Sequence, residues 1–519
     1  MFKKVIYSLV AVSMLASTTS CNDWLDVKPN NEQITDEFWQ TKEDVESVVL
    51  SGYYYMTQAV PTLIRWGEYR GGNFYAVAGS DTKLQDFNIL PTHALCKYSS
   101  IYKIINAANS VIKYAPQVCS IDNTYHEAMM NAHLCEAYFM RAYCNLILVK
   151  NFKEVPLVLE PYVDDSAPFD IAKSSEEEII ESIKSDIMTA LNTGAAKGRY
   201  GDDTWENQGR VTKWALYALM ADVCLWSEDY DVCKVYCDRI LNADESFRPT
   251  LLKETSKWFE IFNPGNSNEG IFELCYSYAL NQSNNNFQSL WPVSGIGTLN
   301  FTSDAKASIC TELEELFVKD PLASGRIGRM EHASILATGG LSAYLTPDPS
   351  IYLWKYTGST DVEVERPSSS KDANFIIYRV ADIVLTKALA ETMTGNYPEA
   401  FALLNTIRVR AGLNNFQDLD DNDTSNLDEA TLLEGILKER RHEFLGEAKR
   451  WYDLLWFGRI AGGKYTQDFI NMVIEGNETT NPAWIRSVLA NSYSWYMPLP
   501  QEDLEHNRLL VQNPYYSSK

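Results

Sequence analysis

The chain has 519 residues, of which 45% are hydrophobic and 22% charged, and its formal net charge is −24. A chain this acidic repels phosphate backbones and anionic membrane surfaces, which argues against nucleic acid as a ligand. The length exceeds that of an ordinary single domain, but no Pro-, Ser- or Gly-rich linker divides the chain, so we expect one large body.

The first 20 residues have the pattern of an export signal. Lys3 and Lys4 precede an apolar run from Val5 to Ala16, and small and hydroxyl residues lead from there to Cys21. The apolar run is too short to span a bilayer, and no later run is long enough either. We therefore predict a lipoprotein signal peptide over residues 1–20, with Cys21 as the acylated first residue of the mature chain. An ordinary signal peptide is the alternative.

Helical periodicity dominates the rest of the chain. Ser175 and Glu178 form the pattern of a capping box, and apolar residues follow at helical spacing as far as Leu191. Other helices are predicted over residues 45–59, 100–114, 125–149, 212–226, 230–241, 378–393, 398–411 and 429–446.

Two turns between predicted helices are similar in sequence. At 228–233 and at 395–400, an Asp or Asn precedes a Tyr that opens the second helix, and a small residue follows three positions later. This pattern resembles the turn of a tetratricopeptide helix hairpin. Because the spacing along the chain is irregular, we predict a mostly α-helical scaffold of such hairpins, at about 40–60, 98–245 and 373–460.

Two segments, at about 61–97 and 246–372, lack this periodicity. The second is rich in Asn, Ser, Gly and Pro, with strands predicted at Gly270–Cys275 and Ile351–Tyr356. Long irregular segments in a folded protein are often functional, so we expect the ligand face here.

Metal and disulfide sites are not expected. Setting Cys21 aside leaves an odd number of the 10 cysteines, which favours buried free thiols over a disulfide framework. No zinc ligand set accompanies Cys233 and Cys237. Residues 418–429 match the ligand spacing of a calcium loop but lack its glycine. We favour an acidic surface loop there, with Asp428 capping the next helix.

No motif of an enzyme is present. The sequence contains no phosphate loop, no dinucleotide fingerprint and no nucleophile elbow, and its many carboxylates single out no glycosidase pair. Residues 438–454 combine charges with aromatic rings, as an active site could. We favour a partly buried Arg–Glu network that fixes how helices dock, in which Arg440 reaches Glu439, Glu443 or helix ends.

A series of motifs extends along nearly the whole chain. They lie at residues 21–26, 133–143, 209–213, 268–272, 375–383, 404–413, 439–443, 450–454, 497–500 and 512–516. Together they resemble the SusD/RagB family of outer-membrane nutrient-binding lipoproteins, most closely at 439–454. The departures, at 152–154 and at Ala448, fall at positions that look structural.

The resemblance implies a single SusD-like body over residues 21–519, anchored by lipid to the outer membrane. The acidic residues that follow Cys21 resemble a surface-export tag, which implies that the body faces the cell exterior. The family captures poly- or oligosaccharides, and some members capture peptides, without catalysis or a cofactor. The implied partner is a TonB-dependent, SusC-like outer-membrane transporter.

Glycan binding needs exposed rings beside polar groups in an open groove. Three clusters in the irregular segments supply such residues, and core packing or loop anchoring is the alternative for each. The first contains Trp66, Tyr69, Arg70, Asn73, Phe74, Tyr75 and Asp81; the second contains Phe287 and Trp291; and the third contains Tyr344, Tyr352 and Trp354.

Overall fold

A computed structural model describes most of the chain. The described residues are 38–76, 79, 81–163, 168–280, 282–284, 290, 299–305, 307–308, 335–336, 351–357, 372–418, 427–477 and 481–517. Cys21 and the signal segment lie outside them. Within these ranges, no helix combines the length and the apolar character needed to cross a membrane.

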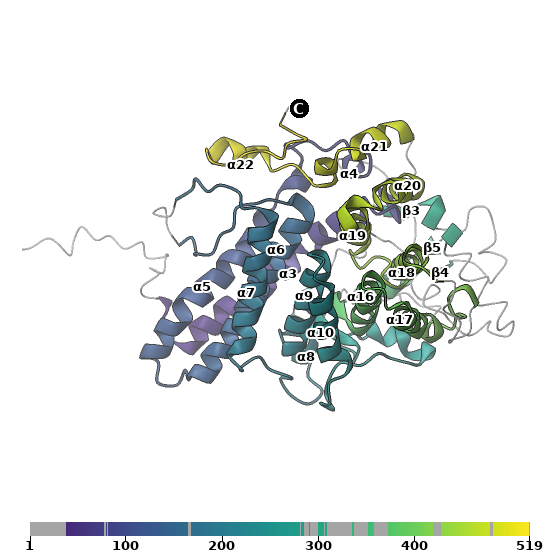
Figure 1. Ribbon diagram of the computed structural model, residues 1–519. Helices are drawn as coiled ribbons and strands as arrows, with labels where there is room; N and C mark the ends of the chain where they lie inside the picture. The colour runs from purple at the N-terminus through teal and green to yellow at the C-terminus, as the bar shows by residue number, and fades with distance from the viewer. Residues whose placement is uncertain are drawn as a thin grey trace, which may run out of the picture.

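Helices form the bulk of the described structure (Figure 1). In the first half they are α3 (Lys42–Glu68), α4 (Thr82–Gln85), α5 (Ser99–Ile121), α6 (Glu127–Phe152), α7 (Glu176–Asn192), α8 (Glu206–Gly209), α9 (Lys213–Trp226) and α10 (Tyr230–Leu241). In the second half they are α15 (Trp354–Thr357), α16 (Val380–Met393), α17 (Tyr397–Arg410), α18 (Glu429–Glu443), α19 (Arg450–Gly463), α20 (Thr466–Gly476), α21 (Pro482–Leu489) and α22 (Gln501–His506).

Consecutive helices pack side by side into one continuous scaffold. The chain of neighbours runs from α3 through α5 and α6 to α7, and then from α9 through α10, α16 and α17 to α18. The contact between α10 and α16 joins hairpins that are far apart in sequence, and α21 and α22 lie along the top of Figure 1. This arrangement confirms the predicted scaffold of helix hairpins.

The two similar turns have the same backbone conformation, as their sequences predict. Asp229 has φ −89° and ψ 64°, and Asn396 has φ −90° and ψ 65°. In both turns the amide of this residue donates to the carbonyl five positions earlier, at 2.8 Å. The preceding residue has a positive φ, 59° at Glu228 and 79° at Gly395, so the turn at 228–233 holds a non-glycine residue in a conformation that favours glycine.

Short antiparallel strand pairs connect the helical layers. They are β1 (Phe74–Ala76) with β3 (Leu299–Phe301), β2 (Gly270–Leu274) with β6 (Phe375–Arg379), and β4 (Ile335–Leu336) with β5 (Ile351–Tyr352). The predicted strand at 270–275 is confirmed. The one at 351–356 is shorter than predicted, because α15 begins at Trp354. Strand β6 was not predicted, since all five of its residues are buried and such a run has no period-2 alternation.

Helix α3 also differs from its prediction, because it continues through Pro61 to Glu68. A proline has no amide to donate to the carbonyl four residues earlier, which usually ends or kinks a helix. Here the hydroxyl of Tyr276 donates to that carbonyl, on Thr57, at 3.0 Å. A side chain from the segment after β2 therefore supplies the hydrogen bond that Pro61 cannot make.

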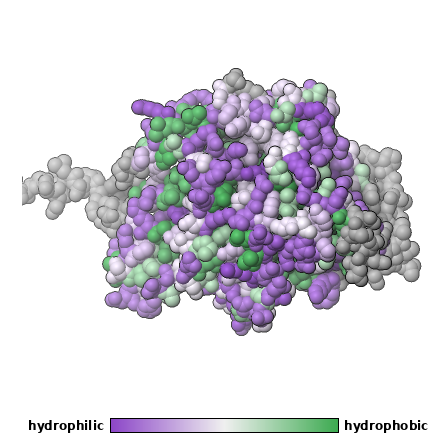
Figure 2. All heavy atoms as spheres, in the orientation of Figure 1, coloured by the Kyte–Doolittle hydropathy of each residue, from purple (hydrophilic) through white to green (hydrophobic). Residues whose placement is uncertain are grey.

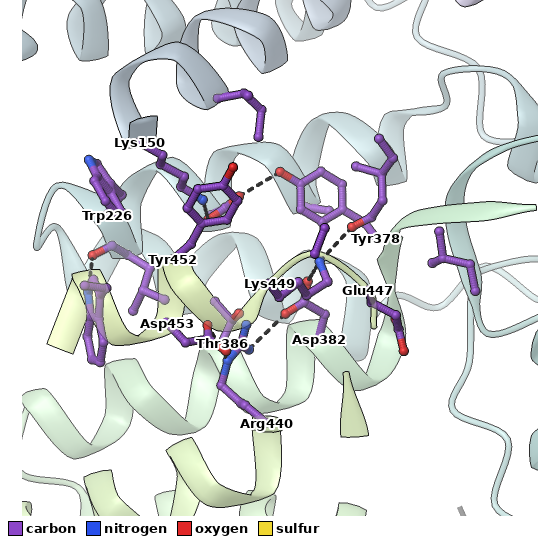
Figure 3. Close-up of a pocket in the computed structure, with 18 of the residues that line it drawn as sticks. Lys150, Trp226, Tyr378, Asp382, Thr386, Arg440, Glu447, Lys449, Tyr452 and Asp453 are labelled. Atoms are coloured by element: carbon purple, nitrogen blue, oxygen red, sulfur yellow. Dashed lines mark hydrogen bonds and ion pairs between the residues drawn. The ribbon is translucent and has the colours of Figure 1, made fainter. Parts of the chain in front are cut away.

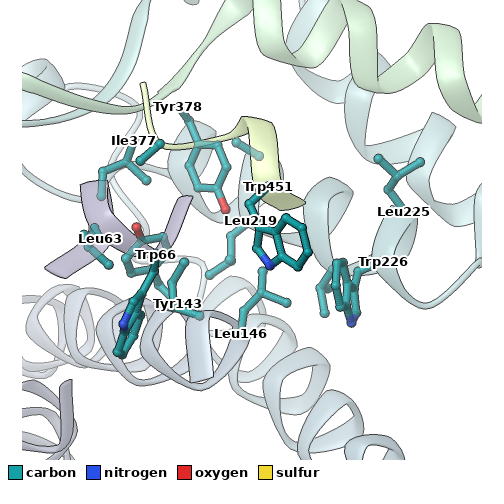
Figure 4. Packing of buried hydrophobic residues seen from close by; sticks show 14 of the residues in the cluster. Leu63, Trp66, Tyr143, Leu146, Leu219, Leu225, Trp226, Ile377, Tyr378 and Trp451 are labelled. Carbon is teal, nitrogen blue, oxygen red and sulfur yellow. The ribbon is translucent and has the colours of Figure 1, made fainter. Parts of the chain in front are cut away.

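The core is continuous and rich in aromatic side chains. Figure 4 shows Trp66, Tyr143, Trp226 and Tyr378 among aliphatic side chains from α3, α6, α9 and β6, and each of these four rings is buried. On the face shown in Figure 2, hydrophobic surface lies in small areas among hydrophilic surface.

Several local predictions are confirmed. Ser175 and Glu178 form the capping box of α7, and the Asp428 carboxylate accepts from the Thr431 amide at 2.8 Å at the start of α18. The eight described cysteines among residues 96–275 are free thiols, and six of them are buried. Most of residues 418–429 and Cys310 lie outside the described residues, so calcium binding there stays a prediction.

Candidate ligand groove

An open groove lies between the first half of α3, the start of α8 and the segment that follows β2. Its volume is about 600 Å³, within the range of small-molecule sites. Helix α3 contributes residues of one face, Leu50, Tyr54, Thr57 and Gln58, which are spaced at successive turns. We call this opening, with walls at 50–58, 205–210 and 266–283, the α3–β2 groove.

Two exposed rings belong to this groove. The side chain of Tyr54 on α3 is 55% exposed, and that of Trp205, just before α8, is 54% exposed. Trp205 lies close against Gly209, where an added Cβ would come within 2.6 Å of the indole. Because Gly209 has no side chain, the ring can pack against α8 and still present surface to the groove. Exposed rings of this kind cover the apolar C–H faces of sugars.

The polar groups that line the groove are almost all uncharged. They are the hydroxyls and amides of Thr57, Gln58, Asn266, Ser277, Gln282 and Ser283. The backbones of Ser277 and Gln282 pair in both directions, at 3.0 and 2.9 Å, and hold a turn whose Leu280 is 71% exposed. Amides and hydroxyls can each donate and accept hydrogen bonds, which matches the hydroxyl groups of a glycan.

Among the described residues that line the groove, Arg210 carries the charge, and it forms ion pairs with carboxylates. Its guanidinium donates to both oxygens of Glu136, at 3.0 and 2.7 Å, and to Glu46 at 2.8 Å. Glu46 also pairs with His133 at 2.6 Å. The hydrogen bond from His133 and the charge of Arg210 lower the pKa of Glu46 to about 2, against the effect of burial. The positive charge of Arg210 is thus compensated by these carboxylates.

The wall after β2 is tied to α3 through Tyr276. The Tyr276 hydroxyl donates to the Thr57 carbonyl, and the Tyr276 backbone amide donates to the Asn374 side chain at 3.2 Å. Asn374 in turn donates to the buried Glu273 at 2.9 Å. These bonds fix the two walls of the groove relative to each other, so the opening is preformed.

Most of the first predicted cluster lies elsewhere, in the protein interior. The side chains of Trp66, Tyr69, Arg70 and Asn73 are each at most 1% exposed. The Trp66 indole donates to the Leu95 carbonyl at 2.8 Å. In this structure these residues pack the core, which was the alternative expected for each of them, and Trp66 also borders a small hollow beside Asp81.

Arg70 shows how completely this region is covered. Its guanidinium lies 4.3 Å from the ring centre of Trp451 and donates to the Trp495 carbonyl at 3.0 Å. Both partners come from the C-terminal part of the chain. Burial is the cause that lowers the pKa of Arg70, to about 10.

The remaining predicted residues are less enclosed or lie outside the described residues. Asp81 borders a smaller hollow of about 250 Å³ and pairs with Arg65 at 3.2 Å. Phe287, Trp291 and Tyr344 are outside the described residues. One sequence pattern could have indicated the groove. Leu50, Tyr54 and Gln58 recur every four residues and so lie on one face of α3, a face that no described element covers.

A small cavity beside α19 is lined by charges (Figure 3), but it suits packing better than binding. Its volume is about 80 Å³, well below that of a ligand site. Lys150 pairs with Asp222 at 2.6 Å, and Asp382 accepts from Arg440 at 2.9 Å and from Lys449 at 2.7 Å. Although burial alone would raise the pKa of Asp382, the two cations hold it well below its usual range.

A second buried network confirms the predicted Arg–Glu network and corrects its pairs. Its side chains are at most 2% exposed and are Lys355, Arg379, Arg410, Glu269, Glu443 and Glu447. Arg440 does not pair with Glu439 or Glu443 as predicted, because Glu443 is engaged by Arg379 and Arg410. Arg440 instead donates to Asp382 and Asp453, which joins α18 to α16 and α19.

The described structure is thus a scaffold of helix hairpins with an open groove that exposed rings line. Two family models match the chain: the model of the SusD family matches residues 341–516, and that of a related group, described as starch-binding and associating with the outer membrane, matches residues 23–225. The chain belongs to the SusD family.

Individual relatives cover nearly the whole chain. SusD-like protein P38 of Formosa agariphila is 25% identical over 88% of this chain and 91% of its own length. A SusD superfamily protein of Bacteroides thetaiotaomicron has a TM-score of 0.71, 19% identity, and coverage of 92% and 99% of the two chains. A laminarin-binding SusD-like protein has a TM-score of 0.68 with 21% identity, at 92% and 99% coverage. These structures confirm the predicted fold.

Proposed function

We propose that the protein is a cell-surface lipoprotein that binds a poly- or oligosaccharide and delivers it to a partner TonB-dependent outer-membrane transporter. The observation that carries the binding step is the pair of exposed rings, Tyr54 and Trp205, in a preformed groove with uncharged polar walls. Family membership and the laminarin-binding relative support a carbohydrate as the ligand.

The groove is suited to binding and not to hydrolysis. Among its described lining residues there is no carboxylate and no histidine. Glycoside hydrolysis uses a pair of carboxyl groups on either side of the bond that is cleaved. This lining supports binding without cleavage as part of the proposal.

The sequence and the family support the proposed anchor and partner. The lipoprotein signal attaches the mature body, residues 21–519, to the membrane through Cys21, and the family's association with the outer membrane supports this location. Delivery requires that the body release its ligand to a channel beside it. Co-purification of the transporter with the full-length lipoprotein from membranes would test this step, and its absence under gentle extraction would count against delivery.

Affinity electrophoresis tests the binding step. A soluble form that lacks residues 1–21 is run in gels that contain one polysaccharide each. We expect at least one glycan to retard the wild type, and Trp205→Ala to lose most of that retardation. Trp484→Ala, which removes another exposed indole from α21, is the matched control and should behave as wild type. Peptides that co-purify with the protein, without retention by any glycan, would favour peptide capture instead.

A further inference from the structure

A second opening lies beside the α3–β2 groove, on the other side of α8. It has a volume of about 350 Å³. Its lining includes the loop at 198–203, Asn207 and Gln208 of α8, and Phe247 and Asn268. We call this opening the α8 hollow.

The α8 hollow has an aromatic surface of its own. The ring of Phe247 is 38% exposed. It is held in place by close contact with Gly198, where an added Cβ would come within 2.7 Å of the ring, and by Trp214 with ring centres 6.4 Å apart. The Arg199 guanidinium also lies over this ring, 5.2 Å from its centre, and the part of the ring that stays exposed can contact a sugar.

Helix α8 is the ridge between the two openings. Trp205 and Gly209 are four residues apart and line the groove, whereas Asn207 and Gln208 line the hollow. A helix is roughly 10 Å wide, so only a ligand of several sugar units reaches both sides.

The ridge is rigidly held. The Asn207 side chain accepts from the Tyr200 amide at 2.7 Å and donates to the Gly201 carbonyl at 2.9 Å. Gln208 donates to the Ser267 carbonyl at 3.2 Å. Because α8 is bonded on both sides, a ligand that crosses it meets a surface that needs no ordering.

The charge of both openings disfavours an anionic ligand. The cation of the groove, Arg210, is engaged by two carboxylates. In the hollow, Arg199 pairs with Asp202 at 2.6 Å, and Asp203 adds a further negative charge. Carboxylates accept hydrogen bonds from the hydroxyls of a neutral sugar but repel sulfate and uronate groups.

We propose that the groove and the α8 hollow form one extended site for a neutral glycan chain that crosses α8. This inference rests on the proposed function and adds the charge class and the minimum length of the ligand. It also gives Phe247 a role in binding.

Two experiments on the soluble form, residues 22–519, test it. The first compares neutral polysaccharides (starch, laminarin and galactomannan) with anionic ones (alginate and polygalacturonate) by affinity electrophoresis at low salt. We expect retention by at least one neutral glycan and by neither anionic one. Retention by an anionic glycan overturns the charge class. Retention by no glycan overturns the proposed function itself. This outcome therefore differs from the one that overturns only the charge class of the ligand.

The second experiment measures Kd by calorimetry for a ladder of oligosaccharides of the glycan that is retained. For wild type, affinity should rise with length beyond the trisaccharide. Phe247→Ala should weaken binding of the hexasaccharide and longer chains about tenfold and leave the di- and trisaccharide unchanged. Trp205→Ala should weaken all lengths. Phe169→Ala, which removes a ring that is 64% exposed elsewhere, is the control.

A wild-type affinity that stops rising at the trisaccharide, or Phe247→Ala binding long chains as wild type does, overturns the extended site. Thermal unfolding of each variant shows that it is folded.

Discussion

Two stretches of similar composition lie on α3 and at its end, and one is exposed while the other is buried. Residues 50–58 belong to α3, whereas residues 65–73 run from its last turn past its end at Glu68, and each stretch combines aromatic rings with polar side chains. Tyr54 in the first stretch is 55% exposed, whereas Trp66 and Arg70 in the second have no exposed surface. Composition alone therefore cannot tell a binding surface from a core, and the difference lies in what packs on each stretch.

The second stretch is covered by the C-terminal part of the chain. A Cβ on Gly67 would come within 2.0 Å of the Ala448 carbonyl, so the segment before α19 lies directly on α3. Trp451 and Trp495 then enclose Arg70. No comparable element covers Leu50, Tyr54 and Gln58 among the described residues, and that face of α3 opens into the groove.

The largest effect is expected from breaking the buried stretch. Trp66→Ala leaves a cavity in a closely packed core and should lower the free energy of unfolding by about 3–5 kcal/mol. Urea denaturation measures this loss. The folded fraction should bind glycan with wild-type Kd. A variant that keeps its stability but loses glycan binding would contradict the assignment of Trp66 to the core.

The next effect comes from Glu68, at the centre of the buried stretch. Burial raises the pKa of Glu68 from 4.5 to about 8. Because the folded state holds this proton more tightly than the unfolded state, the contribution of Glu68 to stability is most favourable at low pH and falls as the pH rises from about 4.5 to about 8.

Glu68→Gln removes this titration and keeps an oxygen for the Ala448 amide, which now donates to the carboxylate at 2.8 Å. Between about pH 5 and pH 7 the wild type should lose about 3 kcal/mol relative to the variant. Denaturant titrations at several pH values measure the difference. Parallel stability curves for the two proteins would show that Glu68 is ionised in the fold.

A substitution in the exposed stretch should have a smaller effect, and this effect should be on glycan binding and not on stability. Tyr54→Ala should weaken glycan binding by about 2 kcal/mol, or roughly 30-fold, with little change in Tm. Tyr493→Ala, in which the lost ring is 37% exposed elsewhere, is the control. Equal affinities for the two variants would remove Tyr54 from the site.

The smallest effect concerns the support of the groove wall. Tyr276→Phe removes the hydroxyl that donates to the Thr57 carbonyl, which Pro61 leaves without its helical donor. We expect a loss of stability of about 1 kcal/mol, measured by thermal unfolding. Replacing Pro61 by Ala in the same variant should restore most of it, because the helical amide then returns. No recovery would show that the two groups do not substitute for one another.

The sequence predicts the helices and the hairpin turns because their periodicity and local bonding are contained in neighbouring residues. Ser175 and Asp428 cap their helices as expected, for example. It does not predict strand β6 or the burial of Trp66 and Arg70. Those depend on partners hundreds of residues away, such as Trp495, whose position only the fold determines. The sequence does not predict the groove for the same reason. Tyr54 and Trp205 line the same opening only because α8 packs on β2.

The central claim is that glycan binds at the exposed stretch of α3 and not at the buried one. Calorimetric titration of the retained glycan into the double variant Tyr54→Ala/Trp205→Ala, beside wild type, tests it most directly. The account predicts a loss of about 100-fold or more in affinity with an unchanged unfolding curve. A wild-type Kd for the folded double variant would contradict it.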